Sequence, residues 1–323
     1  MTKRCEMLAI DDPAEWDELF ARVEHPHLVQ TWAYGEAKRR AGSGQAHRSA
    51  IDAGGWRPRR AAFTLDGEPV AICQLMDKSL AGVACASRIN RGPMLLGPEP
   101  DAETVAAVYG AVRRRRQRHC VLLVLAPALT TGEANVRLLQ SLGFRRRSKG
   151  GWVSTRVDIR LTPEELRAQF SSKWRNRLKV AERSDLSFCE YPGVEGLEWI
   201  IARHLENMAD KQFEGPAPAL LRALHQEAPD RVLVFQALLG DEPAGGMLVY
   251  RFGRGAEYYV GWMGAEGKKV SVGNYLYWNI ALELQLRGCE WIDLGGQRPG
   301  HTEQFKRGLR GTEYELLNEW IAY

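Results

Sequence analysis

The chain has 323 residues, a formal net charge of +4, 45% hydrophobic residues and 26% charged residues. This length exceeds the usual size of one hydrophobic core, so two domains are expected, and the composition argues against a disordered chain. The net charge is far below that of a dedicated nucleic-acid-binding protein.

The N-terminus and the cysteines predict a reduced, cytoplasmic protein. Met1-Thr-Lys-Arg is followed by acidic, mixed sequence, which is unlike a signal peptide, and no run approaches the roughly twenty apolar residues of a membrane span. The six cysteines lie far apart and form no CxxC pair, so no structural zinc is expected. We further expect no metal, no cofactor and a monomeric state.

The first half of the chain predicts strands, a hairpin and two helices. Strands are expected at 60–65 and 70–75, joined by Asp66-Gly67, which is a strong hairpin signal. A helix at 102–116 and a buried strand at 121–125 follow. A second helix, at 135–142, is expected to end at Gly143.

The second half repeats this plan. Strands at 232–238 and 246–250 flank the turn Gly240-Asp241, and a strand at 257–262 continues the sheet. A helix at 274–287 shows an apolar face of helical period, and a short strand at 291–294 follows it. The repetition predicts two similar modules in tandem.

The segment 291–308, WIDLGGQRPGHTEQFKRG, brings a carboxylate, an aromatic ring and a lysine close together in sequence. Its strand breaks at a pair of glycines, which places Asp293 near the carboxyl end of a strand, where α/β sheets usually bind ligands. Phe305 and Lys306 are expected in the polar loop that follows. The alternative is an ordinary turn that carries a solvated lysine.

Several short sequence motifs together resemble those of the Fem-type aminoacyl-tRNA-dependent peptidyltransferases, which add amino acids to the peptide of peptidoglycan precursors. These motifs are LVQTWAYGEAK at 28–38, NRGP at 90–93, SKWRNR at 172–177, DLGG at 293–296 and FKRG at 305–308. The resemblance runs nearly end to end, and LLQSLGF at 138–144 is similar to the closing helix and strand of GNAT acyltransferases.

The resemblance implies an α/β (α+β) fold with two tandem GNAT-like acyltransferase domains, each a mixed central sheet flanked by helices. The first domain is expected at 1–152 and the second at 153–312. The segment 313–323 is expected to return and complete the first domain.

Neither module is predicted to bind coenzyme A through a phosphate-cradling loop. The segment 268–275 has one glycine and then Tyr275 where close approach would be needed. In the first half, Pro98 and Pro100 remove N–H donors and Glu99 would repel a phosphate. This favours aminoacyl-tRNA, the donor that the resemblance implies.

Basic residues gather in three clusters that could meet the phosphates of RNA. They are Arg113 to Arg116 with Arg118, Arg145 to Arg147 with Lys149, and the group Lys173, Arg175, Arg177, Lys179 and Arg183. In the third cluster, on a helix expected after Ser171-Ser172, Trp174 is available to stack on an unpaired base. The alternatives are a solvated helix end for the first cluster and a salt-bridged surface helix for the third.

Three residues of the segment 291–308 are candidates for the catalytic chemistry. The resemblance implies that Lys306 acts on the tetrahedral intermediate of ester aminolysis and that Phe305 packs against the terminal adenosine. A cation is what the oxyanion requires. Asp293 could orient Lys306 or accept the amine proton, although a buried strand-end aspartate satisfied by backbone N–H groups is commoner.

Four residues are candidates for acceptor binding. Lys38 matches a lysine that, in the cell-wall members, contacts phosphates of the nucleotide or lipid carrier, and Tyr258 matches the first tyrosine of a family strand. Val260 stands where a second aromatic is expected, and this departure weighs against the family's peptide acceptor. Arg91 and Lys211 are further anion-binding candidates, and each could equally be a surface cation.

The sequence therefore predicts an aminoacyltransferase. It would transfer an amino acid from aminoacyl-tRNA to an acceptor amine on a peptidoglycan precursor, another peptide or a specialised metabolite. Two alternatives stay open. One is a GNAT-type N-acyltransferase that uses acyl-coenzyme A or a carrier thioester, and the other is a non-catalytic tRNA-binding protein.

Overall fold

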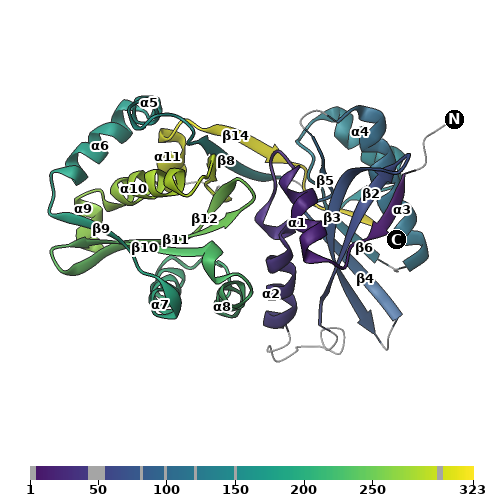
Figure 1. Ribbon diagram of the computed structural model, residues 1–323, viewed down its shortest axis with the longest axis horizontal. Coiled ribbons are helices and arrows are strands. Elements are labelled where there is room, and N and C mark those ends of the chain that lie inside the picture. The colour runs from purple at the N-terminus through teal and green to yellow at the C-terminus, as the bar shows by residue number, and fades with distance from the viewer. Residues whose placement is uncertain are drawn as a thin grey trace. The chain divides into compact units, whose positions relative to one another are not determined.

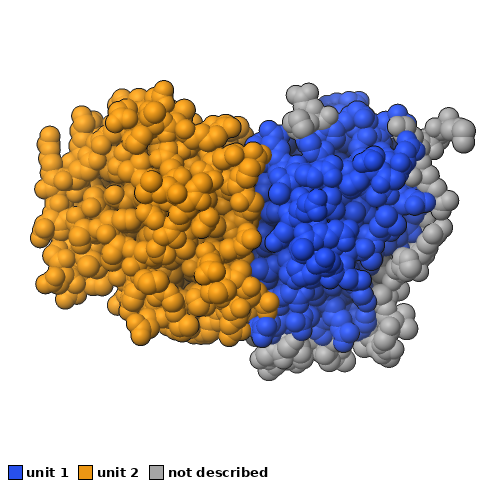
Figure 2. Space-filling view, in the orientation of Figure 1, with its two compact units in different colours: residues 1–152, 315–323 blue, residues 153–314 orange. Residues whose placement is uncertain are grey.

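The computed structural model describes residues 5–42, 55–80, 83–97, 100–119, 122–148, 151–296 and 301–323. The chain forms two compact units, one of residues 1–152 with 315–323 and the other of residues 153–314 (Figure 2). Among the described residues, no helix is long and apolar enough to cross a membrane.

The first unit contains a mixed sheet in the order β1-β2-β3-β4-β6-β15-β7, with β5 paired to β3 (Figure 1). Its strands are β1 (Glu6–Ala9), β2 (Arg57–Leu65), β3 (Glu68–Leu80), β4 (Val83–Asn90), β5 (Met94–Leu95), β6 (Leu122–Ala126), β7 (Arg145–Arg146) and β15 (Trp320–Ala322). The C-terminal strand β15 pairs antiparallel with both β6 and β7.

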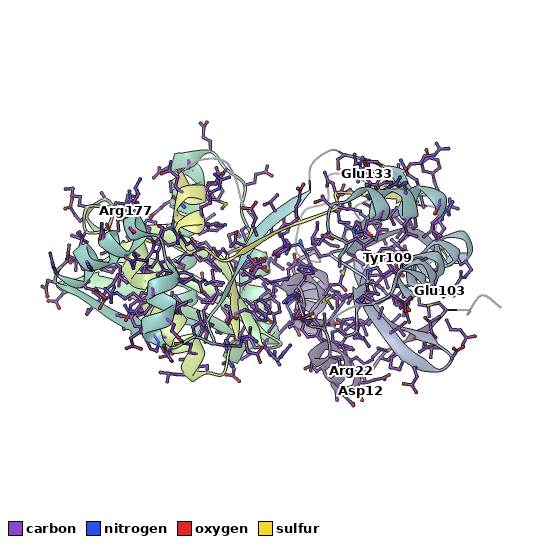
Figure 3. All side chains as sticks on the ribbon, turned by 90° about the horizontal axis from the view of Figure 1, so that it is seen from above. Asp12, Arg22, Glu103, Tyr109, Glu133 and Arg177 are labelled. Atoms are coloured by element: carbon purple, nitrogen blue, oxygen red, sulfur yellow. The ribbon has the colours of Figure 1, made fainter. Side chains whose placement is uncertain are left out.

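Helices cover both faces of the first sheet. They are α1 (Pro13–Ala21), α2 (Trp32–Gly42), α3 (Ala102–His119) and α4 (Glu133–Ser141). The predicted hairpin is confirmed: β2 and β3 pair antiparallel across Asp66 and Gly67, which both have a positive φ. The core of this unit includes Trp320 and Tyr109, and Figure 3 labels the latter.

The second unit contains a sheet in the order β14-β8-β13-β12-β11-β10-β9. Its strands are β8 (Trp152–Asp158), β9 (Leu186–Glu190), β10 (Val232–Leu239), β11 (Glu242–Phe252), β12 (Gly255–Met263), β13 (Trp291–Asp293) and β14 (Thr312–Leu316). The strands predicted at 232–238, 246–250, 257–262 and 291–294 are confirmed with small shifts of their ends.

The helices of the second unit are α5 (Pro163–Gln169), α6 (Ser172–Glu182), α7 (Gly193–Lys211), α8 (Pro218–Glu227), α9 (Ala265–Lys269), α10 (Val272–Leu286) and α11 (His301–Gly308). Figure 1 shows α6 and α10 on one face of the sheet and α7 and α8 on the other. Two successive glycines of β11 face the helices on the two sides of the sheet. A Cβ on Gly245 would contact Leu276 of α10, and one on Gly246 would meet Trp199 of α7.

The two sheets have the same arrangement of strands. In each, an antiparallel meander ends in a strand that pairs parallel with its next neighbour, β4 with β6 and β12 with β13. A long helix, α3 or α10, connects each parallel pair. The parallel neighbour then pairs antiparallel with β15 in the first sheet and with β8 in the second. The repeated plan predicted from the sequence is therefore present as two mixed sheets flanked by helices.

Candidate functional site

The candidate site lies at the carboxyl end of β13, where two parallel strands stop pairing. Residues 255–257 of β12 pair with residues 291–293 of β13, and β12 then continues to Met263 while the other chain turns away. Gly295 makes this turn at φ +69°, and a Cβ there would lie 2.9 Å from the carbonyl oxygen of Tyr258. The opening between the strands is a position where α/β sheets place ligands.

Lys306 is buried at this opening. The residue is 5% exposed, and its Nζ donates hydrogen bonds to the carbonyl oxygens of Gly295 and Gly296, at 3.1 and 2.9 Å. Burial lowers the pKa of Lys306 to about 8, against the opposing effect of Asp293 and Glu257. The alternative of a solvated lysine on an ordinary turn is therefore excluded.

The expectation of a polar loop around Phe305 and Lys306 is wrong, because both residues belong to α11. Glu303 and Arg307 form an i,i+4 ion pair at 2.7 Å on the exposed side of this helix. The Glu–Arg spacing and the following Gly308 were the sequence signals for a short helix that the loop interpretation missed. The helix holds Phe305 and Lys306 on a fixed backbone.

Asp293 is 3% exposed, and four groups surround its carboxylate. Oδ1 lies 2.5 Å from the Ser154 hydroxyl and accepts a hydrogen bond from the Gly295 N–H at 2.9 Å. Oδ2 accepts one from the Tyr314 hydroxyl at 2.6 Å and lies 3.4 Å from Arg156 Nε. These are mainly side-chain partners, not the backbone N–H groups that were expected.

The position of Asp293 fits an orienting role better than direct proton transfer. Its hydrogen bond fixes the Gly295 N–H, and the carbonyl of the same glycine receives Lys306. The sequence interpretation did not include Ser154 and Arg156. Both belong to β8, and because side chains alternate between the two faces of a strand, residues 154 and 156 lie on the same face. The sequence interpretation also missed Tyr314, whose distance in sequence left no signal.

Phe305 packs beside the N-terminus of α10. Its ring centroid lies 5.9 Å from that of Trp174 and 6.2 Å from that of Tyr277. A Cβ on Gly273, in the first turn of α10, would lie 3.9 Å from the Phe305 ring. Trp174 itself is 3% exposed and belongs to the core of the second unit. The expectation that Trp174 is available to stack on a base is therefore corrected, because α11 and α10 cover its indole.

A side chain caps the helix N-terminus in the first unit, whereas the corresponding helix of the second unit has no side-chain cap. In the second unit, Ser271 before α10 is left-handed, and Phe305 lies over the first turn. In the first unit, Asp101 accepts hydrogen bonds from the Thr104 N–H and hydroxyl, which lower the pKa of Asp101. A carboxylate at that place would repel a phosphate. The expected roles of Pro98 and Glu99 fall outside the described residues.

Two acceptor-binding candidates belong to the first unit. Lys38 is exposed on α2, and its amine lies 5.9 Å from the Tyr34 ring. Partial burial of the amine, and then Arg88, lower the pKa of Lys38. Arg91 is buried with φ +51°, and its guanidinium lies 3.6 Å from the Trp152 ring centroid. Arg91 and Trp152 line a pocket of about 480 Å³ at the carboxyl ends of β4 and β6.

The other two candidates belong to the second unit. Tyr258 is partly buried on β12, and burial raises its pKa to about 12. A register shift of β12 against β11 falls at Tyr259, and Val260 is buried. Lys211 ends α7, where partial burial and then Lys268 lower its pKa. Tyr258 thus lies beside the Lys306 site, whereas Lys211 lies at a helix end.

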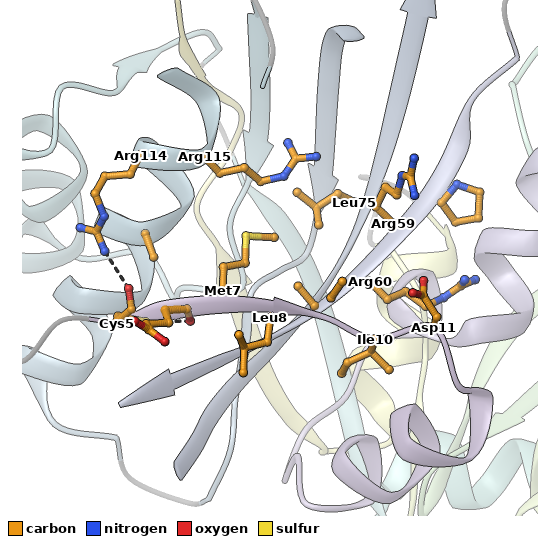
Figure 4. A pocket seen from close by; sticks show the side chains of 15 residues that line it. Cys5, Met7, Leu8, Ile10, Asp11, Arg59, Arg60, Leu75, Arg114 and Arg115 are labelled. Atoms are coloured by element: carbon orange, nitrogen blue, oxygen red, sulfur yellow. Dashed lines mark hydrogen bonds between the residues drawn. The ribbon is translucent and has the colours of Figure 1, made fainter. Parts of the chain in front are cut away.

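The fold itself uses two of the three basic clusters. Arg114 donates to the Cys5 carbonyl at 2.9 Å, and Arg115 binds Asp77 at 2.6 Å and Ser87 at 2.9 Å. These arginines line a pocket of about 490 Å³ formed by β1, β2 and α3 (Figure 4). The expectation that this cluster is available to phosphates is therefore not supported for Arg114 and Arg115.

The second cluster contacts the C-terminal strand and the turn before it. Arg145 donates to the Tyr323 hydroxyl at 2.7 Å, Arg146 lies over the Trp320 ring, and Arg147 pairs with Glu319. Lys149 lies outside the described residues. In the third cluster, Arg175 is half-buried and donates to the carbonyls of Ala168 and Phe170.

Comparisons with known proteins identify the fold. Residues 167–307 match the family model described as Acetyltransferase (GNAT) domain. A crystal structure of FemX is similar over 98% of this chain and 96% of its own, with a TM-score of 0.76 at 14% identity. A tandem GNAT protein from the clavulanic acid biosynthesis pathway covers 99% and 98%, with a TM-score of 0.53 at 13% identity.

A third similar structure is the C-terminal domain of a putative lysylphosphatidylglycerol synthetase from Agrobacterium fabrum. It covers 96% of this chain and 92% of its own, with a TM-score of 0.50 at 11% identity. A search among proteins of curated function gave no match. The predicted fold class is confirmed: the chain has the tandem GNAT fold of FemX, with two mixed sheets flanked by helices.

Proposed function

We propose that the protein is an aminoacyltransferase that forms an amide bond between an amino acid carried on tRNA and an acceptor amine. The observation that carries this proposal is the buried Lys306 ammonium. An ammonium has three N–H donors, and Gly295 and Gly296 accept two of them. Among the residues that the structure describes, no acceptor takes the third donor, which would meet the oxyanion beside the end of β13.

The reaction requires three movements of charge. The acceptor nitrogen attacks the ester carbonyl carbon and loses a proton, the carbonyl oxygen becomes an oxyanion, and the bond to the ribose oxygen then breaks as that oxygen gains a proton. Lys306 stabilises the oxyanion, and Asp293 positions it through Gly295. Phe305 packs against the terminal adenosine of the donor.

The donor assignment rests on how the helix N-termini are used. Asp101 caps α3 and would repel the pyrophosphate of coenzyme A, and Phe305 packs close to Gly273 in the first turn of α10, which leaves less room for it there. An ester-linked amino acid on RNA needs no such cradle. This donor would also confine the reaction to the cytoplasm.

The acceptor is an amine on a peptidoglycan precursor, another peptide or a specialised metabolite. In the first unit, Lys38 and Arg91 are candidates for binding its anionic groups, and in the second unit the candidates for acceptor binding are Lys211 and Tyr258. Burial of Arg91 against Trp152, next to a pocket, favours it over an ordinary surface cation. A bidentate guanidinium suits a carboxylate or a phosphate.

The test is transfer of radiolabelled amino acids from total charged tRNA into the small-molecule and peptide fractions of a cell extract. We expect labelled amide product that RNase pretreatment abolishes and that acetyl-coenzyme A does not replace. Transfer from the thioester alone would instead establish the N-acyltransferase alternative. The match of residues 167–307 to a GNAT acetyltransferase model supports that alternative. Binding of tRNA without product would indicate a non-catalytic protein.

The pH dependence of the reaction should report the charge of Lys306. Its pKa is lowered to about 8, so the ammonium required for oxyanion stabilisation is lost as the pH rises through about 8. We expect the ratio of kcat/KM between the wild-type protein and Lys306→Arg to fall above that pH, since arginine stays charged. The ratio cancels the ionisation of the acceptor amine, which both proteins share. A ratio that rises through pH 8 would mean that neutral Lys306 acts as a base.

A further inference from the structure

The exposed face of α6 differs from the other basic surfaces of the protein. It carries Lys173, Arg177, Lys179 and Arg183, which are all exposed. None of the four forms an ion pair within the part of the chain that the structure describes. The acidic residue on this helix, Glu182, is paired to Arg167 of α5 at 2.5 Å. Figure 3 labels Arg177 on this face.

Four other exposed arginines of the protein have acidic partners. Ion pairs join Arg137 to Glu133, Arg160 to Asp158, Arg222 to Glu198 and Arg254 to Glu290, at distances of 2.5 to 3.1 Å. The other two basic clusters contact Asp77, Glu319 and the C-terminal strand. Exposed cations without an ion pair also occur elsewhere among the described residues, at Arg57, Arg59, Lys211, Lys268 and Arg310, whereas α6 carries four of them on one helix.

Lys173 is placed against the stability of the helix, whereas Lys179, in the last turn, has the position that the macrodipole favours. Lys173 lies in the first turn, where the macrodipole disfavours a positive charge, and that turn contains no acidic residue. Lys173 and Arg177 form a like-charged i,i+4 pair, as do Lys179 and Arg183, and each such pair costs about 0.2–0.5 kcal/mol. Ser171 caps the helix, and Trp174 and Leu178 anchor its buried side, which offsets this cost.

The first turn of α6 lies next to the helix that carries the candidate catalytic lysine. The Ser171 N–H donates to the Gly308 carbonyl at 2.8 Å, and Trp174 packs against Phe305. A Cβ on Gly308 would lie 2.8 Å from the Trp174 ring, so the two helices are in close contact. A ligand bound along α6 from Arg183 to Lys173 therefore runs toward α11.

From these observations we infer that the exposed face of α6, defined by Lys173, Arg177, Lys179 and Arg183, is a docking surface for the phosphate backbone of RNA near its aminoacylated end. The inference rests on the proposed function for the identity of the RNA. The ten-residue separation of Lys173 and Arg183 corresponds to about 15 Å at about 1.5 Å per residue. This length is enough to contact several phosphates, because each strand of a DNA duplex carries one phosphate about every 3.4 Å along the helix axis.

The docking surface differs from the RNA-binding site predicted from the sequence, which included stacking of a base on Trp174. Trp174 is buried, so binding at α6 depends on charge and not on stacking. Electrostatic binding of this kind depends steeply on salt. The logarithm of the binding constant changes by about 0.7–0.9 per phosphate contact and per logarithmic unit of salt.

The test is binding of deacylated total tRNA, measured by fluorescence anisotropy over a series of salt concentrations. A variant with Lys173, Arg177, Lys179 and Arg183 all changed to Gln is compared with a control in which Arg137, Arg160, Arg222 and Arg254 are changed to Gln. Both variants lose four positive charges, so they have the same net charge. Circular dichroism and the Tm verify that both variants are folded. If the fourfold α6 variant is not folded, the single variants Arg177→Gln and Lys179→Gln are measured in its place.

We expect the α6 variant to lose at least about tenfold in tRNA affinity near 0.1 M salt, with a salt slope that is smaller by about 3. The control should bind like the wild-type protein. Equal affinities of the two variants, or no tRNA binding by the wild-type protein, would overturn the inference. So would α6-dependent binding to phosphatidylglycerol vesicles in place of tRNA.

The binding experiment distinguishes failure of the docking surface from failure of the proposed aminoacyltransferase function. Deacylated tRNA is not a substrate, so its binding is measured without any transfer reaction. If α6 binds tRNA but no amino acid is transferred, the docking surface stands and the aminoacyltransferase proposal fails. If transfer occurs while the α6 variant binds tRNA normally, the proposed function stands and the docking surface lies elsewhere.

Discussion

Replacing Lys306 by alanine is expected to lower turnover by about 100-fold while the protein stays folded. Removal of one donor to a developing oxyanion typically costs about 10²–10³ in kcat. The Lys306 ammonium is buried and held by two carbonyl groups, so solvent cannot easily substitute for it. The measurement is the single-turnover rate of amide formation at saturating donor, with the Tm recorded in parallel.

The matched control for Lys306→Ala is Arg307→Ala on the same helix. Arg307 is exposed and paired with Glu303, and such pairs contribute about 0–1 kcal/mol. We expect Arg307→Ala to keep its turnover and its Tm. Unchanged turnover in folded Lys306→Ala would remove the lysine from the mechanism, and a collapse of the Tm would instead assign it a structural role.

Replacing Asp293 by alanine is expected to destabilise the second unit by about 3–5 kcal/mol, because it leaves a buried charge without its partner. Arg156 would lose its carboxylate, and the Ser154 and Tyr314 hydroxyls and the Gly295 N–H would lose an acceptor. At about 2–4 °C per kcal/mol for a domain of this size, the Tm should fall by about 10 °C. Thermal unfolding monitored by circular dichroism measures the change.

The control for Asp293→Ala is Asp158→Ala on the neighbouring strand β8. Asp158 pairs with Arg160 near the surface, where an ion pair contributes little, so its loss should shift the Tm only slightly. Equal shifts for the two variants would contradict the buried network. Tyr314→Phe combined with Asp293→Ala should cost less than the sum of the single changes, since both remove the same hydrogen bond.

Asp293→Asn separates the two roles considered for this residue. Asparagine keeps an oxygen for the Gly295 N–H, so the turn that holds Lys306 should persist and most of the turnover with it. If Asp293→Asn instead loses as much turnover as Lys306→Ala at an unchanged Tm, the carboxylate itself takes the proton of the amine.

The sequence was sufficient for much of the local structure. Asp66-Gly67 required positive φ values at both positions and therefore predicted the hairpin of β2 and β3. The apolar period of α10 and the N-cap Ser171 of α6 predicted those helices. The helix α11 was missed because it is short and polar and begins next to residues that carry no helix signal.

The site could be predicted only in part. The residues around Asp293, Phe305 and Lys306 were found because they are neighbours in one segment that resembles a known family. Ser154, Arg156 and Tyr314 were not found, because they reach Asp293 through β8 and β14, which the sheet brings beside β13. Pairing between strands far apart in sequence leaves no local pattern.

By itself, the sequence determined the repeated order of strands and helices and the candidate lysine, because hydrophobic period, turn residues and short motifs act locally. Only the tertiary structure decided which charged groups are buried and which are paired. It buried Lys306 and thereby lowered its pKa, it placed Trp174 in the core, and it paired two of the basic clusters with distant parts of the chain. Burial and ion pairing depend on neighbours in space, and those neighbours lie outside the local sequence pattern of the residue concerned.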